Sequence, residues 1–333
     1  MYPYLVYNNR GMAKQQSTYK GPGKWFRKGI SMIEVIQMFP DDKTAECWFS
    51  ELRWPHGPEC PHCGSDNVQS GCAHHSMPYR CRACRKRFSV RTDTVMADTK
   101  LGYRIWALSI YLICTSIKGI SSMRLSRELG ITQKSAWHLA HRLRAGLAAP
   151  AGLFAGPVEV DEVYIGGKEG NKHASKKLRA GRGTVGKQPV VGGRDRASGR
   201  VHAQVVPNTT KEELQDFVKR IAIPGAKVYT DSSSSYQSLE GFEHQAVNHS
   251  SGEYVRGTVS TNAIESFWAL FKRGLYGIYH HMSVRHLHRY LEEFCGRSNL
   301  RNLDTAEQMR QLALGLQGRR LTWATLAGRA AAA

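Results

Sequence analysis

Three acidic residues in the C-terminal half lie where packing alone would not favour a carboxylate. Asp161 interrupts the strand-forming run VEVDEVYIG, Asp231 closes the apolar run AKVYTD, and Glu265 lies within TNAIESFWALFKRG. Aspartate is depleted from strands, so the first position is the least expected. An acid within one strand, one at the end of another and one on a later helix can converge. Converging carboxylates hold hard divalent cations, and two such ions stabilise the attacking and leaving oxygens of an in-line phosphoryl displacement.

The two strand acids also have structural interpretations. Asp161 could bond a neighbouring loop, with Glu159 or Glu162 as the functional acid instead. Asp231 could cap a helix that follows it, since aspartate accepts hydrogen bonds from the first backbone N–H groups of a helix. The sequence leaves both interpretations open.

The segment around Glu265 has apolar residues at helical spacing, which predicts a helix with one buried side. Asn262, Glu265 and Lys272 fall close together beside that side, because a seven-residue step turns a helix by almost two full turns. Asn262 and Glu265 also have the spacing of a capping box, in which the acid would only satisfy backbone N–H groups.

Two CxxC pairs in the N-terminal third have the spacing of a zinc site. Cys60 and Cys63 form the first pair, Cys81 and Cys84 the second, and 17 residues separate the pairs. Tetrahedral Zn²⁺ takes four thiolates from two such turns, and a site with all four positions filled is structural rather than catalytic. Two unrelated buried or redox-active pairs are the alternative. Cys72 lies between the pairs without a partner at a suitable spacing.

A run of basic residues surrounds the second CxxC pair, and no acid occurs from Tyr79 to Thr92. Arg85, Lys86 and Arg87 lie at the centre of this run. A merely solvated charged surface would usually mix signs, so we expect this edge to bind phosphates.

The whole chain of 333 residues has a net charge of +20 with an ordinary apolar content of 41%. This balance favours a folded protein with a polyanionic partner, and its length favours two or more domains. An anionic membrane surface is the weaker choice of partner. The longest apolar stretch, Ile105 to Ile117, has 13 residues, and spanning a bilayer needs about 20.

The N-terminal residues MYPYLVYNNRGMAKQQ lack the apolar centre and cleavage site of a signal peptide. We therefore expect a cytoplasmic protein in a reducing environment, where the eight cysteines would not form four disulfides.

The segment KGISSMRLSRELGITQKSAWHLAHRLRAGL predicts two helices joined by a glycine turn. Ser121 or Ser122 opens the first helix, Gly130 ends it, and Thr132 caps the second. This pattern is typical of a helix-turn-helix, although any helical hairpin looks similar. Lys134 and His138 are the expected base-reading residues. The full set expected to point outward from the second helix is Gln133, Lys134, Trp137, His138 and Arg142.

From residue 158 onward, strand and helix patterns alternate, which predicts an α/β layered domain. The expected strands are 158–166, Pro189–Gly193, Arg200–Val206 and 226–231. The expected helices are Thr210–Ile221, 233–240, 262–274 and 283–295, and two short helices broken at Phe39-Pro40 are expected within 31–52.

Four blocks of this sequence together resemble a known family. They are CPHCGS…YRCRACRKRFSVRTDTVM, VEVDEVYIGGKEGNKH, YTDSSSSY and HSSGEYVRGTVSTNAIESFWALFKRGLYGIYHHMSVRHLHRYLEEFCGRSN. In order and spacing they resemble the zinc-ribbon class of bacterial insertion-sequence DDE transposases, from about Lys24 to Asn302.

The resemblance implies a ribonuclease-H-like catalytic domain that binds Mg²⁺ or Mn²⁺ through Asp161, Asp231 and Glu265. It implies DNA partners, namely element ends and target DNA, and a homo-oligomer in the DNA complex. Lys272 would contact a phosphate near the cut. Some relatives carry Asn in place of the third acid, so Asn262 is a candidate for supporting the metal site.

The resulting organisation has five parts. They are a flexible N-terminus (1–30), short helices with a zinc ribbon (31–98), a helix-turn-helix-like segment (99–149), the catalytic domain (153–302) and a C-terminal tail (303–333).

Three other functions would fit single features of the sequence. A DNA-binding regulator would use only the ribbon and the helix-turn-helix, leaving the acids unexplained. A tyrosine recombinase is suggested by Arg289 and Tyr290, and a rolling-circle nuclease by the pair His280 and His281. Metal-dependent strand cleavage would separate the transposase from the regulator.

Overall fold

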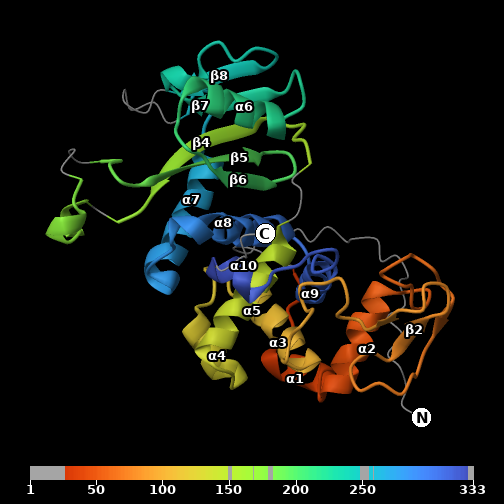
Figure 1. Ribbon diagram of the computed structural model, residues 1–333. Helices are drawn as coiled ribbons and strands as arrows, with labels where there is room; N and C mark the ends of the chain where they lie inside the picture. The colour runs from red at the N-terminus through yellow and green to blue at the C-terminus, as the bar shows by residue number, and fades with distance from the viewer. Residues whose placement is uncertain are drawn as a thin grey trace.

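The computed structural model in Figure 1 describes residues 27–148, 152–167, 169–178, 183–247, 255–257 and 259–328. The expected flexible N-terminus therefore lies almost wholly outside the described residues, as do residues 149–151, where the helix-turn-helix-like segment ends. Among the described helices, none is both long and apolar enough to cross a membrane.

Two short helices begin the described chain, α1 (Met32–Met38) and α2 (Asp42–Arg53). The Ser31 hydroxyl and the Asp41 carboxylate cap them by accepting from backbone N–H groups of the first turns. The break between the helices falls at Phe39-Pro40, as the sequence predicts.

The zinc-ribbon region forms a small antiparallel sheet of three strands in sequence order. They are β1 (Val68–Gln69), β2 (Tyr79–Cys81) and β3 (Arg87–Phe88). Trp54 at the end of α2 packs edge-on against Tyr79 and Phe88, with ring centroids 5.3 and 5.8 Å away. Because these strands are so short, this aromatic contact and the cysteine cluster must hold them in place.

The helical segment that follows contains α3 (Tyr103–Thr115), α4 (Ser122–Leu129) and α5 (Gln133–Leu147). The Ser121 side chain caps α4 and Thr132 caps α5, while Gly130 ends α4 with a left-handed φ of 63°. The helix boundaries predicted for this segment are thus confirmed.

The C-terminal half is built on a five-stranded mixed sheet with the order β6-β5-β4-β7-β8. Strands β4, β5 and β6 form an antiparallel meander, and β7 and β8 join the sheet parallel to β4. This topology is consistent with a ribonuclease-H-like fold. The bounds are β4 (Val158–Ile165), β5 (Gln188–Asp195), β6 (Val201–Val205), β7 (Lys227–Asp231) and β8 (Glu243–Val247).

Helices cover both faces of this sheet. One face packs on α6 (Lys211–Ile221), and its core includes Val158 and Val160 of β4. The other face packs on α7 (Asn262–Gly274) and α8 (Val284–Leu300), with Val163 and Ile165 in its core. A π-helical turn, Leu275–Tyr279, extends α7. Side chains of β4 thus alternate between the two layers, as a strand buried on both faces requires.

Two sequence-based expectations in this half are wrong. The helix expected over 233–240 is a single 3-10 turn, Ser234–Tyr236, and β8 was not expected. Strand β8 has the polar sequence EHQAV and lies at the sheet edge, so it lacks the apolar run of a buried strand.

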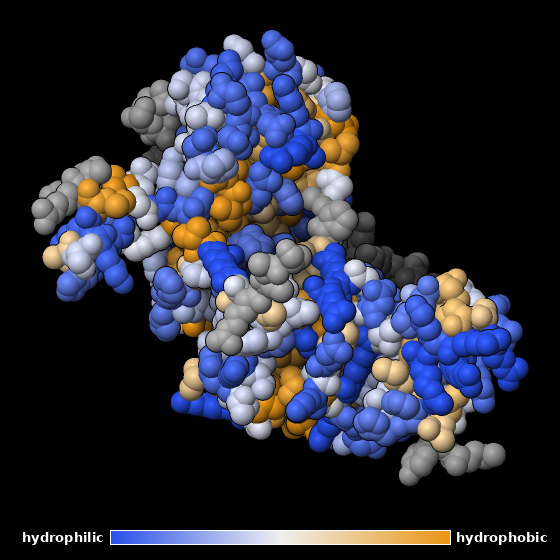
Figure 2. Space-filling model, viewed as in Figure 1, coloured by the Kyte–Doolittle hydropathy of each residue, from blue (hydrophilic) through white to orange (hydrophobic). Residues whose placement is uncertain are grey.

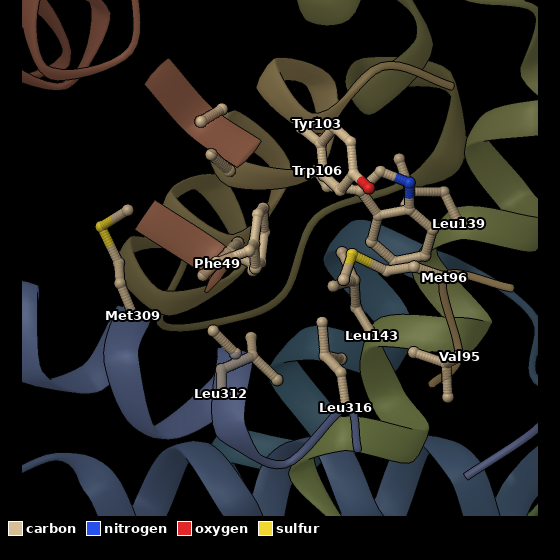
Figure 3. Close-up of a cluster of buried hydrophobic side chains, with 14 of the residues drawn as sticks. Phe49, Val95, Met96, Tyr103, Trp106, Leu139, Leu143, Met309, Leu312 and Leu316 are labelled. Atoms are coloured by element: carbon tan, nitrogen blue, oxygen red, sulfur yellow. The ribbon is translucent and has the colours of Figure 1, made fainter. Parts of the chain in front are cut away.

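The expectation that residues after 302 form only a tail is also wrong. They include two helices, α9 (Thr305–Leu314) and α10 (Trp323–Ala327). Figure 3 shows Met309, Leu312 and Leu316 packed in the same cluster as residues of α2, α3 and α5. The spacing of these apolar residues is that of an amphipathic helix, so the signal was present in the sequence. The α/β domain is therefore inserted between two parts of one helical core.

A buried ion-pair network joins α5 to α8. Glu293 is fully buried, and its carboxylate lies 2.7 Å from Arg144 Nε and 2.9 Å from Arg297 Nη1. The Tyr279 hydroxyl donates to the same carboxylate at 2.8 Å. Burial alone would raise the pKa of Glu293, but the two guanidinium groups lower it. The helical segment is thereby fixed against the α/β domain.

If α9 belongs to the core, Leu312→Ala should lower the free energy of unfolding by about 2–5 kcal/mol, since it leaves a cavity. The matched control is Arg310→Ala on the exposed side of the same helix, expected to change it by less than about 0.5 kcal/mol. Denaturant titration of both variants measures the difference. Equal stability of the two variants would contradict the placement of α9.

Candidate active site and zinc centre

The four cysteines of the two CxxC pairs converge in the zinc ribbon. Their Sγ atoms all lie within 4.8 Å of one another. Cys60 Sγ lies 3.6 Å from Cys84 Sγ, and Cys63 Sγ lies 3.7 Å from Cys81 Sγ. A tetrahedron of Zn–S bonds of about 2.3 Å has edges of about 3.8 Å, so these distances fit Zn²⁺.

The cysteines of this cluster shift one another's pKa in opposite directions. The Cys84 backbone N–H donates to Cys81 Sγ at 3.4 Å and, with the neighbouring cysteines, lowers the pKa of Cys81 to about 6, whereas burial and the other three sulfurs raise the pKa of Cys63 to about 11. Cys72 lies outside the cluster, with its thiol 3.7 Å from the Gln69 carbonyl. The ribbon therefore offers four thiolates at the right spacing for one structural zinc ion.

The turn from β2 to β3 presents the basic edge expected from the sequence. Arg85, Lys86 and Arg87 are all exposed. Arg91 instead has a structural role, since its guanidinium lies 4.0 Å from the centre of the Tyr103 ring and donates to a backbone carbonyl. The exposed residues leave a basic surface beside the cysteine cluster.

In the catalytic sheet, the alternation of β4 separates Asp161 from its acidic neighbour Glu162. Asp161 follows the parity of Val163, which faces α7 and α8, whereas Glu162 follows that of Val160, which faces α6. The Tyr236 hydroxyl donates to Glu162 at 2.7 Å. Asp161 is thus on the side of the sheet that carries α7.

Asp231 lies on the neighbouring strand β7, at the same distance along the sheet as Asp161 and on the same face. Val158 pairs with Val228 in the parallel register, and each aspartate lies three residues beyond its valine. The Ser233 backbone N–H donates to Asp231 at 3.1 Å, and Ser233, rather than Asp231, caps the 3-10 turn that follows. The helix-capping interpretation of Asp231 is therefore wrong.

Glu265 lies in the first turns of α7, but not as part of a capping box. Thr261 is the N-cap residue and Asn262 the first helical residue, and the Thr261 hydroxyl donates to Glu265 at 2.7 Å. The capping-box interpretation is therefore wrong as well. Asn262, Glu265 and Lys272 are all exposed, with Lys272 in the last turn of α7.

The three acids are close enough to affect one another electrostatically. Burial, together with the negative charges of Glu162, Asp231 and Glu265, raises the pKa of Asp161 to about 7. Within the described residues, only the cysteines form a group of three or more potential ligands spaced within 4.8 Å. The carboxylates are therefore near neighbours, spaced more widely than the thiolates. Such mutual repulsion is what a bound cation relieves.

The contact that brings α7 to β4 was not predicted from the sequence, which marked Glu159 only as an alternative functional acid. The buried Glu159 carboxylate accepts from the backbone N–H groups of Ala263 and Ile264 at 2.7 and 3.0 Å, and so caps α7 from the sheet. Its other oxygen lies 2.5 Å from Arg196 Nε. The only sign of this role in the sequence is an acidic residue within a strand-forming run.

Arg196 extends this contact to the remaining elements. Its Nη2 donates to the Ser260 carbonyl at 2.9 Å, just before α7, and its guanidinium lies 4.9 Å from the centre of the Tyr229 ring in β7. The pair of Glu159 and Arg196 thus contacts all three elements that carry the candidate acids. Close packing supports this arrangement, since a Cβ added to Gly192, which pairs with Asp161, would lie 2.5 Å from the Trp268 ring.

The expected DNA-reading face of α5 is largely covered by the C-terminal segment. Arg142 is buried, and both its Nε and His138 Nε2 lie within 3.2 Å of the Leu321 carbonyl. Trp137 packs edge-on against Trp323 of α10. The expectation that Trp137, His138 and Arg142 point outward is therefore wrong, because the sequence does not reveal what returns to cover a helix.

Two residues of that face remain exposed, Gln133 and Lys134. Lys134 Nζ lies 4.7 Å from the centre of the Trp323 ring. The role of Lys134 and His138 in reading DNA stays a prediction.

Neither Tyr290 nor the pair His280 and His281 is placed as a tyrosine recombinase or a rolling-circle nuclease would require. Tyr290 is only 7% exposed, and the Arg144 guanidinium lies 4.1 Å from its ring centre. His280 and His281 follow the π-helical turn and are not in a strand. A buried tyrosine in an aromatic cluster is not placed to attack DNA.

Comparisons with known proteins match both halves of this arrangement. Residues 154–299 match the ISXO2-like transposase domain, and residues 40–87 match the transposase zinc-ribbon domain. A curated protein of Halobacterium salinarum, described as an uncharacterized protein in transposable element ISH50, is 30% identical over 253 residues, covering 72% of this chain and 85% of that protein. The chain belongs to this family of zinc-ribbon, ISXO2-like transposases.

Among solved structures, a chain of the simian T-cell lymphotropic virus intasome in complex with PP2A regulatory subunit B56 gamma overlaps 55% of this chain and 66% of its own length. The sequence identity is 15% and the TM-score is 0.27. That score is too low to establish a shared arrangement of domains.

The cysteine geometry predicts about one Zn²⁺ per chain. Cys81→Ser should lose the metal and unfold the ribbon, because small metal domains fold through their metal. Cys72→Ser is the matched control and should keep it. Metal analysis of the purified proteins, with limited proteolysis of residues 55–92, tests this. Zinc retained by Cys81→Ser would contradict the four-thiolate site.

Glu159→Gln tests the structural role of the buried carboxylate. It keeps an acceptor for the N-terminus of α7 but removes the charge paired with Arg196, at a cost of about 3 kcal/mol or more in unfolding free energy. Glu162→Gln, on the same strand but the opposite face, retains its bond to Tyr236 and should cost less than about 1 kcal/mol. Denaturant titration measures both. Equal losses would show that Glu159 has no special role.

Proposed function

We propose that this transposase cuts DNA at the ends of an insertion sequence and joins the freed ends to target DNA. Asp161, Asp231 and Glu265 are the proposed catalytic ligands of Mg²⁺ or Mn²⁺. The observation that carries the proposal is geometric: Asp161 and Asp231 share one face of adjacent strands, and Glu265 lies on the helix that Glu159 holds against that face. Such a cluster of like charges, within a chain of net charge +20, is costly without a cation.

The residues themselves divide the work. The two aspartates belong to adjacent strands and are held by the sheet, whereas Glu265 is carried by α7 and is positioned through Glu159. When bound, the divalent ions would supply the positive charge that activates water and stabilises the displaced oxygen. Without them, the carboxylates would repel the phosphate backbone of DNA.

Both proposed reactions use the same in-line chemistry. In the first, the oxygen of water attacks the phosphorus at the element end, and the bond to the 3′-oxygen breaks to leave a free 3′-hydroxyl. In the second, that hydroxyl attacks a phosphodiester of the target and displaces one of its oxygens. A single site can therefore serve both steps.

Further residues are proposed to hold the DNA. Exposed Arg85, Lys86 and Arg87 suit contacts with phosphates, which give affinity without sequence preference. Lys272, exposed on α7, is proposed to contact a phosphate near the cut, and Asn262 to support the metal site.

The assembly is proposed to be a homo-oligomer that acts on DNA in the cytoplasm. A regulator without catalysis is not favoured, because the transposase domain match spans all three acids.

Asp161→Asn, Asp231→Asn and Glu265→Gln should each lower strand cleavage by about a thousandfold or more, since the ions contribute several kcal/mol. Each amide keeps the shape of the side chain but removes the charge that holds a cation. Binding to element-end DNA should be unchanged or slightly stronger, because a negative charge beside the phosphate is lost. Glu162→Gln is the control that should still cut.

The measurement is strand cleavage on element-end DNA with and without Mg²⁺, beside a binding assay in the absence of metal. If Glu265→Gln still cuts and Asn262→Ala does not, Asn262 supplies the third ligand. If all three amides cut in Mg²⁺, the proposed metal-dependent mechanism is wrong.

A further inference from the structure

The hairpin that connects β4 to β5 continues beyond the sheet as an arm, which is defined as its described residues, 166–167, 169–178 and 183–187. Figure 1 shows it in green at the left, standing away from the sheet and the helices. Its described residues include two 3-10 turns, Glu169–Asn171 and Ala174–Lys176. None of its described residues is buried, so core packing does not account for this insertion.

The charge of the arm is strongly one-sided. The sequence from 166 to 187 contains seven Lys and Arg but a single acid, Glu169. In the chain as a whole, 47 basic residues are accompanied by 27 acidic ones. A segment that needed charge only for solubility would mix the two signs, so this composition points to a polyanionic partner.

The single acid of the arm is turned inward. The Glu169 carboxylate pairs with Lys172 Nζ at 2.6 Å and accepts from the Leu178 backbone N–H. Its side chain is 12% exposed. Lys172 and Leu178 lie over Gly186, where an added Cβ would be 2.4 Å from Lys172 Nζ. The arm is thus folded on itself, with its negative charge neutralised internally.

Two lysines of the described arm, Lys176 and Lys177, face solvent, whereas Lys187 at its base is half-buried. Among the described residues, neither Lys176 nor Lys177 takes part in an ion pair. In Figure 2 hydrophilic side chains cover much of the arm where it stands off the body of the molecule. A folded support that presents lysines in this way suits the phosphates of a nucleic acid, which attract cations without requiring a base sequence.

The position of the arm relates it to the catalytic acids. Asp161 lies four residues before the end of β4 at Ile165, a distance of about 13 Å along the strand. Duplex DNA lying at the acids would reach the base of the arm about four base pairs away. We propose that the arm is a DNA-binding surface in addition to the basic edge of the zinc ribbon. It contacts the backbone of duplex DNA several base pairs from the scissile phosphate. This rests on the proposed function only in that the acids act on DNA.

The test is the double substitution Lys176→Ala and Lys177→Ala in the full-length, zinc-loaded protein. The probe is a 40-base-pair duplex of mixed sequence, because phosphate contacts do not depend on sequence. If each lysine neutralises one phosphate, the slope of log K against log salt should fall by about 2. The loss of affinity between 50 and 200 mM salt should then shrink by about tenfold.

Lys211→Ala with Lys219→Ala is the matched control. These lysines are exposed on α6, which covers the face of the sheet opposite to α7, and the change in net charge is the same. The control should leave the slope within about 0.5 of the wild type, since it removes no phosphate contact. Substituting Arg85, Lys86 and Arg87 together serves as the positive control for a contact expected in the ribbon.

The proposal is overturned if the arm variant behaves like the α6 control. It is also overturned if the arm variant changes only self-association in sedimentation experiments, because the arm would then contact a second copy of the chain. If the salt slope changes in the ribbon variant but not in the arm variant, the DNA-binding role of the arm is refuted and the proposed function stands. If the wild type binds no duplex, both the role of the arm and the proposed function are refuted.

Discussion

The catalytic half depends on one buried carboxylate, that of Glu159, which joins the strand of Asp161 to the helix of Glu265. A helix N-terminus leaves backbone N–H groups without partners, and Glu159 satisfies two of them. A carboxylate buried in this way needs a cation, which Arg196 provides. Because Arg196 also contacts Tyr229 of β7, the same pair fixes the strand of Asp231. The relative placement of the three acids thus follows from a contact that none of them makes.

A second buried carboxylate, that of Glu293, joins the two halves of the molecule in the same way. Glu293 binds Arg144 from α5 and Arg297 from its own helix, and it accepts from the Tyr279 hydroxyl. Buried ion pairs lose most of their attraction to desolvation, so they contribute more to a defined geometry than to stability. We infer that this network sets how the helical segment is oriented on the catalytic domain.

The segment that follows α8 strengthens that connection. Helix α9 returns to the helical core, where the Val95 backbone N–H donates to the Leu316 carbonyl at 3.0 Å and Thr94 bridges to Gln317. The α/β domain is therefore attached to the core at both of its ends. Helix α10 continues across α5 and covers the face that a helix-turn-helix would turn toward DNA. In this family member, the zinc ribbon and the arm offer more accessible basic surfaces than that helix does.

The sequence by itself determined the elements whose signals are local. The CxxC pairs define a metal site because ligand spacing is short-range, and the caps at Ser121 and Thr132 define helix ends because capping acts within one turn. The sequence also picked out the three acids, each by its unusual place in a run. Only the tertiary structure decided which acids face one another, because strand parity and register depend on neighbouring strands. It alone showed that Glu159 is structural and that Arg142 is covered, since burial by a segment 179 residues away leaves no local trace.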